Sequence, residues 1–490
     1  MGTTGTIQQT SSQPTPAGAK SGALIKWAVP LGLGVIIYLT PPPAGLNVLA
    51  WHYFAMFVAV IAALITEPLP GAVIGFSGVA FCGAFRLVGG NAADGIRWAL
   101  GGFSNATVWL IYAASLFALG YEVTGLGRRI ALALVHKLGK HTLGLGYAIA
   151  LSDLILAPFT SSNTARASST FPIFTSIPPL YGSTPTENPR KIGSYVIWVA
   201  FATQCVSSSI FLTALAPNVL AIELTRKIAK VDISWSQWFY GFLPVGIVLF
   251  LAVPLLSYIL YPPELKRGDE VPKWAGKQLA EMGPITWREK KMGILAVAAL
   301  ICWIGATKWI TPEMTALVVC ALMMLTGVVT WNQIAGNKMG WTNLVWLATL
   351  VNMADGLSKV GFLTWFAQRS AAILSHVSVV TMMVALVAIF FLVHYFFASL
   401  SAHTTALLPV FLAAMLTLPG LPIRPVTMVI GYTLGLMGVI TPYATGPGPM
   451  FYGTGYIKTK DFWRLGFIFG MFFLLCLLGI ELPFALKFIH

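Results

Sequence analysis

Charged residues are scarce in this sequence. Asp, Glu, Lys and Arg make up only 9% of its 490 residues, whereas about 25% is usual for soluble domains. Hydrophobic residues make up 57%, and apolar stretches long enough to cross about 30 Å of hydrocarbon recur along the chain. The composition excludes an ordinary soluble fold and predicts an all-α protein that crosses a lipid bilayer many times.

Residues suited to metal binding or redox chemistry are also few. The five cysteines lie singly within apolar runs, without the spacing of a metal site, and we interpret them as small hydrophobic side chains. No His, Asp, Glu or Cys grouping in the sequence has ligand spacing, and no nucleophile is paired with a base. We therefore expect no catalytic residue, no metal and no cofactor, which argues against a membrane enzyme.

Acidic residues are fewer than basic ones. The sequence has 16 Asp and Glu against 30 Lys and Arg, which gives a formal net charge of +14. Cytoplasmic loops of membrane proteins carry an excess of Lys and Arg. When the N-terminus is placed in the cytoplasm, most basic residues fall in the expected inner segments and the C-terminus becomes periplasmic. The basic character therefore indicates membrane topology, and we expect no nucleic-acid partner.

The beginning of the sequence has neither the cleavage pattern of a signal peptide nor the Arg-rich amphipathic character of a transit peptide. Residues 1–21, rich in Thr, Ser, Gln and Gly, are expected to form a disordered tail. These features favour a multi-pass protein of the bacterial cell inner membrane.

Two apolar segments, residues 143–182 and 378–417, are each interrupted by a polar cluster. Polar backbone survives at membrane depth only where protein or a water-filled cavity surrounds it. We interpret both segments as re-entrant helical hairpins that add no net crossing. Elsewhere the apolar pattern predicts eleven crossings, near residues 22–41, 49–66, 69–88, 105–135, 192–231, 236–261, 292–311, 314–331, 342–371, 424–457 and 464–488.

The two halves of the sequence resemble each other. Val108 and Val345 each begin a Val-Trp-Leu motif at an offset of 237 (345 − 108), the hairpin tips are offset by 240 (403 − 163), and two proline breaks by 230 (447 − 217). Five predicted crossings separate the tips, so the second copy is inverted, as in many secondary transporters. The predicted organisation is a first half at 22–261 with a broken helix at 192–231, a cytoplasmic connector at 262–291, and a second half at 292–490 with a broken helix at 424–457.

In an inverted repeat of this kind, broken helices present their N-terminal ends near the bilayer midplane, where they favour anions. Proline and glycine prevent residues 213–218 and 441–449 from forming continuous helix. We therefore expect both tips and both breaks to form the substrate site of a transporter, with an anion channel as the alternative of another class. The candidate residues are Ser162, Asn163, Thr164, Arg166, Ala402, His403, Thr404, Thr213, Pro217, Asn218, Thr445, Gly446 and Pro447.

The tip Ser162-Asn163-Thr164 and the segment from Ile440 to Pro449, which continues to Tyr456, resemble the divalent anion:sodium symporter family. The resemblance covers nearly the whole chain from about residue 22 and is strongest to bacterial citrate/succinate, tartrate/succinate and 2-oxoglutarate/malate exchangers. It implies transport of C4 to C6 di- or tricarboxylates by an elevator-like movement of the hairpin domain. It also implies a homodimer built by a separate scaffold domain.

This sequence departs from the family symporters, which carry Ser-Asn-Thr at both tips and bind sodium there. The second tip reads Ala402-His403-Thr404, and Arg166 follows the first tip. Our central hypothesis is that Arg166 and His403 are fixed cations that replace sodium. An empty carrier would keep this charge and stall, so exchange would become obligatory.

Several alternatives stay open at this point. A sodium-coupled dicarboxylate symporter of the same fold is the closest rival. Arg166 has the alternative role of a structural arginine that satisfies hairpin carbonyls, and His403 that of a satisfied core histidine. Ser162 is also a suitable helix cap. Asp153, an intramembrane carboxylate without a visible partner, is a weak candidate for a proton site.

Overall fold

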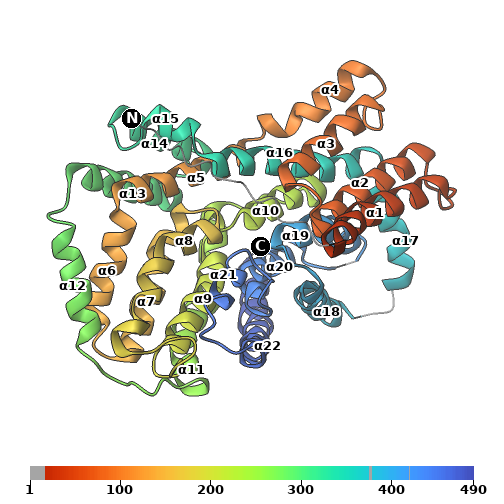
Figure 1. Ribbon diagram of the computed structural model, residues 1–490. Helices are drawn as coiled ribbons and strands as arrows, with labels where there is room; N and C mark the ends of the chain where they lie inside the picture. The colour runs from red at the N-terminus through yellow and green to blue at the C-terminus, as the bar shows by residue number, and fades with distance from the viewer. Residues whose placement is uncertain (1–16, 375–377, 419, 490) are drawn as a thin grey trace, which may run out of the picture.

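The computed structural model describes residues 17–374, 378–418 and 420–489, and this part of the chain is helical without a single strand (Figure 1). Of the disordered tail expected at residues 1–21, residues 1–16 lie outside the described part of the chain. Residues 17–21 differ from the prediction, because they belong to a helix that begins at Ala17. The helices up to the connector are α1 (Ala17–Leu39), α2 (Val48–Thr66), α3 (Gly71–Ala84), α4 (Ala92–Gly101), α5 (Ala106–Thr124), α6 (Leu126–Leu138), α7 (Thr142–Leu156), α8 (Asn163–Thr175), α9 (Gly193–Ile210), α10 (Ala216–Ala229) and α11 (Trp235–Leu260).

The connector contains one helix, α12 (Glu270–Glu281), and the second half follows it. The remaining helices are α13 (Trp287–Gly305), α14 (Pro312–Leu325), α15 (Trp331–Ala335), α16 (Lys338–Lys359), α17 (Phe362–Leu374), α18 (Val379–Leu392), α19 (Leu400–Met415), α20 (Ile423–Leu436), α21 (Gly448–Tyr452), α22 (Thr459–Cys476) and α23 (Leu482–Phe488). Within the described ranges, 6 helical segments are long and apolar enough to cross a membrane, and further apolar helices are shorter. The all-α membrane fold is therefore confirmed, while the count of eleven crossings stays a prediction.

Two segments expected as single crossings, residues 105–135 and 342–371, are each divided into two helices. Gly125 ends α5 with φ 76°, and Gly361 separates α16 from α17 with φ 83°. Glycine adopts this left-handed conformation without a steric penalty and commonly ends helices. The apolar pattern continues across both glycines, which is why it did not reveal the turns. The equivalent break in each half agrees with an internal repeat.

At each polar cluster one helix ends and another begins. After α7 and a short turn (Ala157–Phe159), the chain reverses and α8 begins; after α18 and a turn (Val393–Phe396), α19 begins. The Ser162 side chain accepts a hydrogen bond from the Ala165 N–H at 3.3 Å, and the Ser399 side chain does the same for Ala402 at 3.3 Å. Each serine therefore caps its helix.

The caps correct the alignment of the two tips. Ser162 and Ser399 are offset by 237 (399 − 162), as the flanking Val-Trp-Leu motifs are, so Arg166 is equivalent to His403. The sequence comparison had paired Asn163 with His403 instead. The backbone N–H groups of Arg166 and His403 both donate to the carbonyl of their capping serine at 3.0 Å, so the two residues occupy the same place in the first helical turn.

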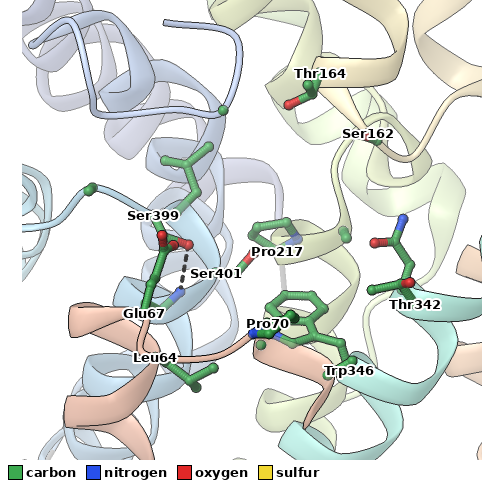
Figure 2. Close-up of a pocket in the computed structure, with 18 of the residues that line it drawn as sticks. Leu64, Glu67, Pro70, Ser162, Thr164, Pro217, Thr342, Trp346, Ser399 and Ser401 are labelled. Carbon is green, nitrogen blue, oxygen red and sulfur yellow. Dashed lines mark hydrogen bonds between the residues drawn. The ribbon is translucent and has the colours of Figure 1, made fainter. Parts of the chain in front are cut away.

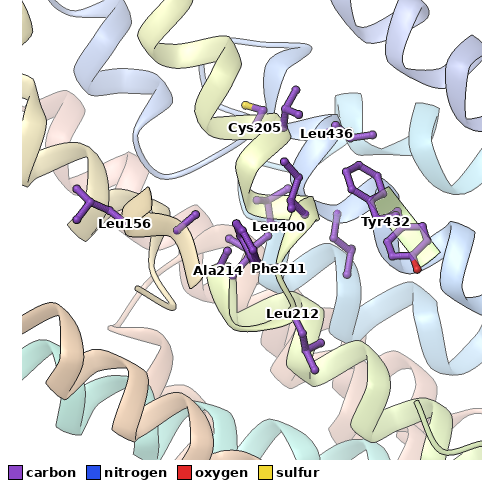
Figure 3. Packing of buried hydrophobic residues seen from close by; sticks show 14 of the residues in the cluster. Leu156, Cys205, Phe211, Leu212, Ala214, Leu400, Tyr432 and Leu436 are labelled. Carbon is purple, nitrogen blue, oxygen red and sulfur yellow. The ribbon is translucent and has the colours of Figure 1, made fainter. Parts of the chain in front are cut away.

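The two halves pack together through shared hydrophobic clusters. Leu156, Cys205 and Leu212 from the first half belong to the same buried cluster as Leu400 and Tyr432 from the second (Figure 3). The packing is reinforced by a hydrogen bond in which the Ser209 hydroxyl donates to the Tyr432 carbonyl at 2.8 Å. In Figure 1, α9 and α22 lie in the middle of the molecule, with α6 and α12 on one side and α1, α2 and α17 on the other.

Candidate substrate-binding site

A cavity of about 640 Å³ lies where the two hairpin tips meet. Residues 161–164 of the first tip and 398–402 of the second line it, together with residues 215–217 and 445–446 of the two helix breaks (Figure 2). The opposite wall is contributed by other elements, the end of α2, the beginning of α3 and the first turns of α16. Its lining residues are Leu64, Glu67, Pro68, Leu69, Pro70, Gly71, Ala72, Ile74, Thr342, Asn343 and Trp346.

The helices α8 and α19 both begin at this cavity. The N–H groups in the first turn of a helix have no acceptor within the helix, so Asn163 and Thr164 in α8, and Leu400 and Ser401 in α19, bring such groups to the cavity wall. Aligned peptide dipoles add a partial positive charge at each of these ends. Two half-helices from the two halves of the chain thus form an anion-attracting wall.

The first tip is tied to the breaks of both halves. The Ala216 N–H donates to the Ser161 carbonyl at 2.9 Å, and the Asn163 side-chain amide donates to the Thr445 hydroxyl at 2.6 Å. At Gly446, an added Cβ would lie 2.3 Å from the Thr164 hydroxyl oxygen, so a larger residue there would force the Thr164 side chain to shift. These contacts hold the cavity-lining residues of the two halves in one arrangement.

The Arg166 side chain points away from the cavity and is fully buried. Its Nε donates to one Asp153 carboxylate oxygen at 2.8 Å, and the other oxygen accepts a hydrogen bond from Ser207. The Arg166 Nη2 also donates to the Ser208 hydroxyl at 2.8 Å. Asp153, for which the sequence indicated no partner, therefore neutralises the arginine inside the protein.

The remaining donors of Arg166 reach backbone carbonyls. Its Nη1 donates to the Ala214 carbonyl at 3.1 Å and to the Thr160 carbonyl at 3.4 Å, and Nη2 to that of Gln204 at 3.4 Å. One guanidinium thus connects the first tip to the first helix break. This is the alternative role weighed above, a structural arginine that satisfies hairpin carbonyls, and it leaves no guanidinium nitrogen directed at the cavity.

His403 is likewise buried and absent from the cavity wall. Its Nδ1 lies 3.3 Å from Nδ1 of His394, whose Nε2 lies 2.7 Å from the Ala444 carbonyl oxygen. The rings of Phe390 and Phe397 pack on His403 with centroid separations of 4.4 and 4.9 Å. If His394 donates to Ala444 through Nε2, its Nδ1 accepts from His403, so two neutral imidazoles account for both contacts. The buried Nε2 of His403 has no hydrogen-bond partner among the described residues.

Seven of the thirteen predicted site residues line the cavity: Ser162, Asn163, Thr164, Pro217, Ala402, Thr445 and Gly446. The other six lie behind it: Arg166, Thr213, Asn218, His403, Thr404 and Pro447. Three of those six brace the backbone, since the Thr213 hydroxyl donates to Pro158 O, the Asn218 amide to Ser208 O and the Thr404 hydroxyl to Leu400 O. They shape the site without facing it.

Sequence reasoning missed the wall that faces the tips. Thr342 and Trp346 lie in α16, which the repeated Val-Trp-Leu motif marked as a helix without indicating a role. Glu67 ends α2 between two apolar segments, and an acidic residue there, followed by Pro68, was the available signal. His394 belongs to none of the motifs found in the sequence and precedes the aromatic residues Tyr395, Phe396 and Phe397.

An all-helical membrane protein in which the N-terminal ends of two half-helices meet at one cavity has the architecture of a secondary transporter. The family model described as the sodium:sulfate symporter transmembrane region matches residues 22–486. The chain therefore belongs to the divalent anion:sodium symporter family, as the sequence motifs indicated, and is not an enzyme.

Relatives within the family are close. The L-tartrate/succinate antiporters of Escherichia coli (strain K12) and Shigella sonnei (strain Ss046) are each 47% identical to this chain over 466 residues, which cover 92% of this chain and 96% of each relative. Two solved structures share the fold at low identity. The Alcanivorax borkumensis YdaH transporter has a TM-score of 0.53 at 15% identity over 85% of this chain and 96% of its own, and Neisseria gonorrhoeae MtrF has 0.52 at 13% over 85% and 94%.

Proposed function

We propose that this protein exchanges C4 to C6 di- or tricarboxylates, such as succinate, malate, tartrate, 2-oxoglutarate and citrate, across the bacterial inner membrane. Relatives that are named L-tartrate/succinate antiporters and align with nearly the whole chain support exchange and favour C4 diacids among these substrates. The observation that carries the proposal is the meeting of the first turns of α8 and α19 at one cavity of about 640 Å³.

Each tip takes one carboxylate of the diacid in this proposal. The N–H groups of Asn163 and Thr164 and the Ser162 hydroxyl serve one carboxylate, and the first turn of α19 serves the other. Hydrogen bonds to a charged group contribute about 1.5–3 kcal/mol each. Because each of the two helix ends binds one carboxylate, the site favours a molecule with acidic groups at both ends over a monocarboxylate.

Exchange follows from the fixed position of these helix ends. Among the described residues that line the cavity, none is Lys or Arg, so the positive potential comes from backbone dipoles that cannot leave with the substrate. An empty site that crosses an apolar barrier leaves those donors without partners, which is unfavourable. A bound diacid supplies the partners. In this proposal Arg166 and His403 are positioning residues, and the helix ends take over the role first given to these side chains.

The cavity has a hairpin wall and a second wall from α2, α3 and α16, which supports relative movement of two parts. We propose that the hairpins, with the broken helices α9–α10 and α20–α21, move as an elevator against a scaffold that also forms a homodimer. The proposed halves remain 22–261 and 292–490, joined by the connector at 262–291, with the N-terminus cytoplasmic and the C-terminus periplasmic.

The test is counterflow in proteoliposomes with radiolabelled succinate and tartrate. We expect uptake to require a dicarboxylate inside the vesicles and not to respond to a sodium gradient. The second candidate is sodium-coupled symport, favoured by the absence of Lys and Arg among the described cavity residues and by the family's sodium-coupled members. Sodium-driven uptake into empty vesicles would establish that candidate, and sustained single-channel currents would establish a channel.

A further inference from the structure

Glu67 is the one ionisable side chain among the described residues that line the substrate cavity. It is exposed to the cavity, and no hydrogen-bond or ion-pair partner of its carboxylate is found within the described ranges. Figure 2 shows its side chain extending from the end of α2 toward Ser399 and Ser401 of the second tip. An anion-binding cavity thus carries one fixed negative charge opposite its helix ends.

The backbone holds this carboxylate in place at a cost. Glu67 is the C-cap of α2 in the left-handed conformation, with φ 48° and ψ 56°, and its N–H donates to the Ala63 carbonyl at 2.9 Å. Glycine is the usual residue at such a position, and other residues adopt it with strain. Pro68 and Pro70 then restrict the loop that follows. Strained residues that persist cluster at functional sites.

We infer that Glu67 is a specificity-determining residue that selects diacids carrying a hydroxyl group. The inference rests on the proposed function, because it concerns diacids held by the two tips. An ionised carboxylate only accepts hydrogen bonds, so Glu67 repels an unsubstituted diacid such as succinate. A hydroxyl on the carbon chain of malate or tartrate donates to Glu67 and offsets that repulsion. The discriminating group is thus the hydroxyl donor, and the tips remain the binders of the carboxylates.

Glu67→Gln and Glu67→Ala separate the hydrogen bond from the charge. Glutamine keeps an uncharged acceptor oxygen, whereas alanine removes the acceptor. Hydrogen bonds to charged acceptors are stronger than those to neutral ones, so the preference for tartrate over succinate is expected to fall about tenfold in Glu67→Ala and by a smaller factor in Glu67→Gln. Glu264→Gln, an exposed position outside the cavity, is the matched control with an unchanged preference.

The measurement is competition of unlabelled tartrate, malate and succinate against labelled succinate in counterflow, with the inhibition constants of each variant compared as ratios. The inference is supported if the preference for tartrate over succinate decreases from the unsubstituted protein to Glu67→Gln and further to Glu67→Ala. If the inhibition constants of all three diacids change by the same factor, or do not change, their ratios stay the same. Glu67 then has at most a general electrostatic or structural role, and the inference is overturned. If the unsubstituted protein exchanges no diacid at all, the proposed function fails first, so the two failures are distinguishable.

Discussion

The two hairpins perform one structural task with different chemistry. In the first, the charged pair of Arg166 and Asp153 connects the tip to the carbonyl of Ala214 in the helix break. In the second, His403 and His394 connect the equivalent tip to the carbonyl of Ala444. The residue at the same place in each first turn therefore faces inward and braces its own half. The comparison teaches that a basic residue beside a binding tip need not face the substrate.

Arg166→Ala is expected to have the largest effect. It leaves the Asp153 carboxylate buried without its partner, and breaking a buried ion pair from one side costs about 3–5 kcal/mol. We expect a large drop in the melting temperature of the detergent-purified protein, together with loss of exchange. The measurement is thermal unfolding followed by tryptophan fluorescence, with and without succinate.

The double variant Asp153→Asn, Arg166→Gln is the control for this prediction. It removes both charges and leaves polar groups of similar size, so its destabilisation should be smaller than that of Arg166→Ala alone. If Arg166→Ala keeps the melting temperature of the unsubstituted protein and loses only its stabilisation by succinate, Arg166 binds substrate directly. The fixed-cation hypothesis would then be restored.

His403→Ala is expected to have a smaller effect than Arg166→Ala. It removes one contact with His394 and leaves a cavity among Phe390 and Phe397 without leaving a charge unpaired. The expected cost is about 1–3 kcal/mol, with exchange slower and the apparent affinity for succinate within a few-fold. An effect as large as that of Arg166→Ala would mean that the second half also depends on a buried charge.

Ser162→Ala and Ser399→Ala test whether the tips are equivalent at the cavity. Each removes a helix cap worth about 1 kcal/mol and one hydroxyl from the cavity wall, so both should raise the apparent KM of counterflow by similar factors. Ser176→Ala is the control in the first hairpin, because Ser176 is exposed and lies outside the cavity. It should change neither stability nor KM appreciably. A severe effect of only one capping serine would mean that the two carboxylates of the diacid are not held symmetrically.

The fold was largely predictable because its pattern is strong. Long apolar runs indicate membrane helices, and the two polar clusters marked where α8 and α19 begin. Of the two helix caps, Ser162 was indicated by the sequence but Ser399 was not. Backbone turns at Gly125 and Gly361 were not predictable from hydrophobicity, since apolar residues continue through them.

The site was predictable only in part. Polar residues in a repeated motif marked the tips, but the direction of a side chain depends on its partners. Asp153 lies on another helix than Arg166, and their pairing becomes visible only when α7 and α8 are packed. Glu67 belongs to a wall outside the repeated motifs, and so no comparison of the two halves reveals it.

Gly125→Ala and Gly361→Ala give the smallest effects and sharpen the comparison, because here the two halves use the same device. Both glycines have a left-handed φ, 76° and 83°, which costs alanine about 1–2 kcal/mol. An added Cβ would meet nothing within 4 Å at Gly361 and only the Met282 side chain at 3.7 Å at Gly125, so the cost is backbone strain alone. Thermal unfolding should therefore show equal, modest destabilisation for both variants. A clear inequality would mean that the turns, like the braces behind the tips, are held by different contacts in the two halves.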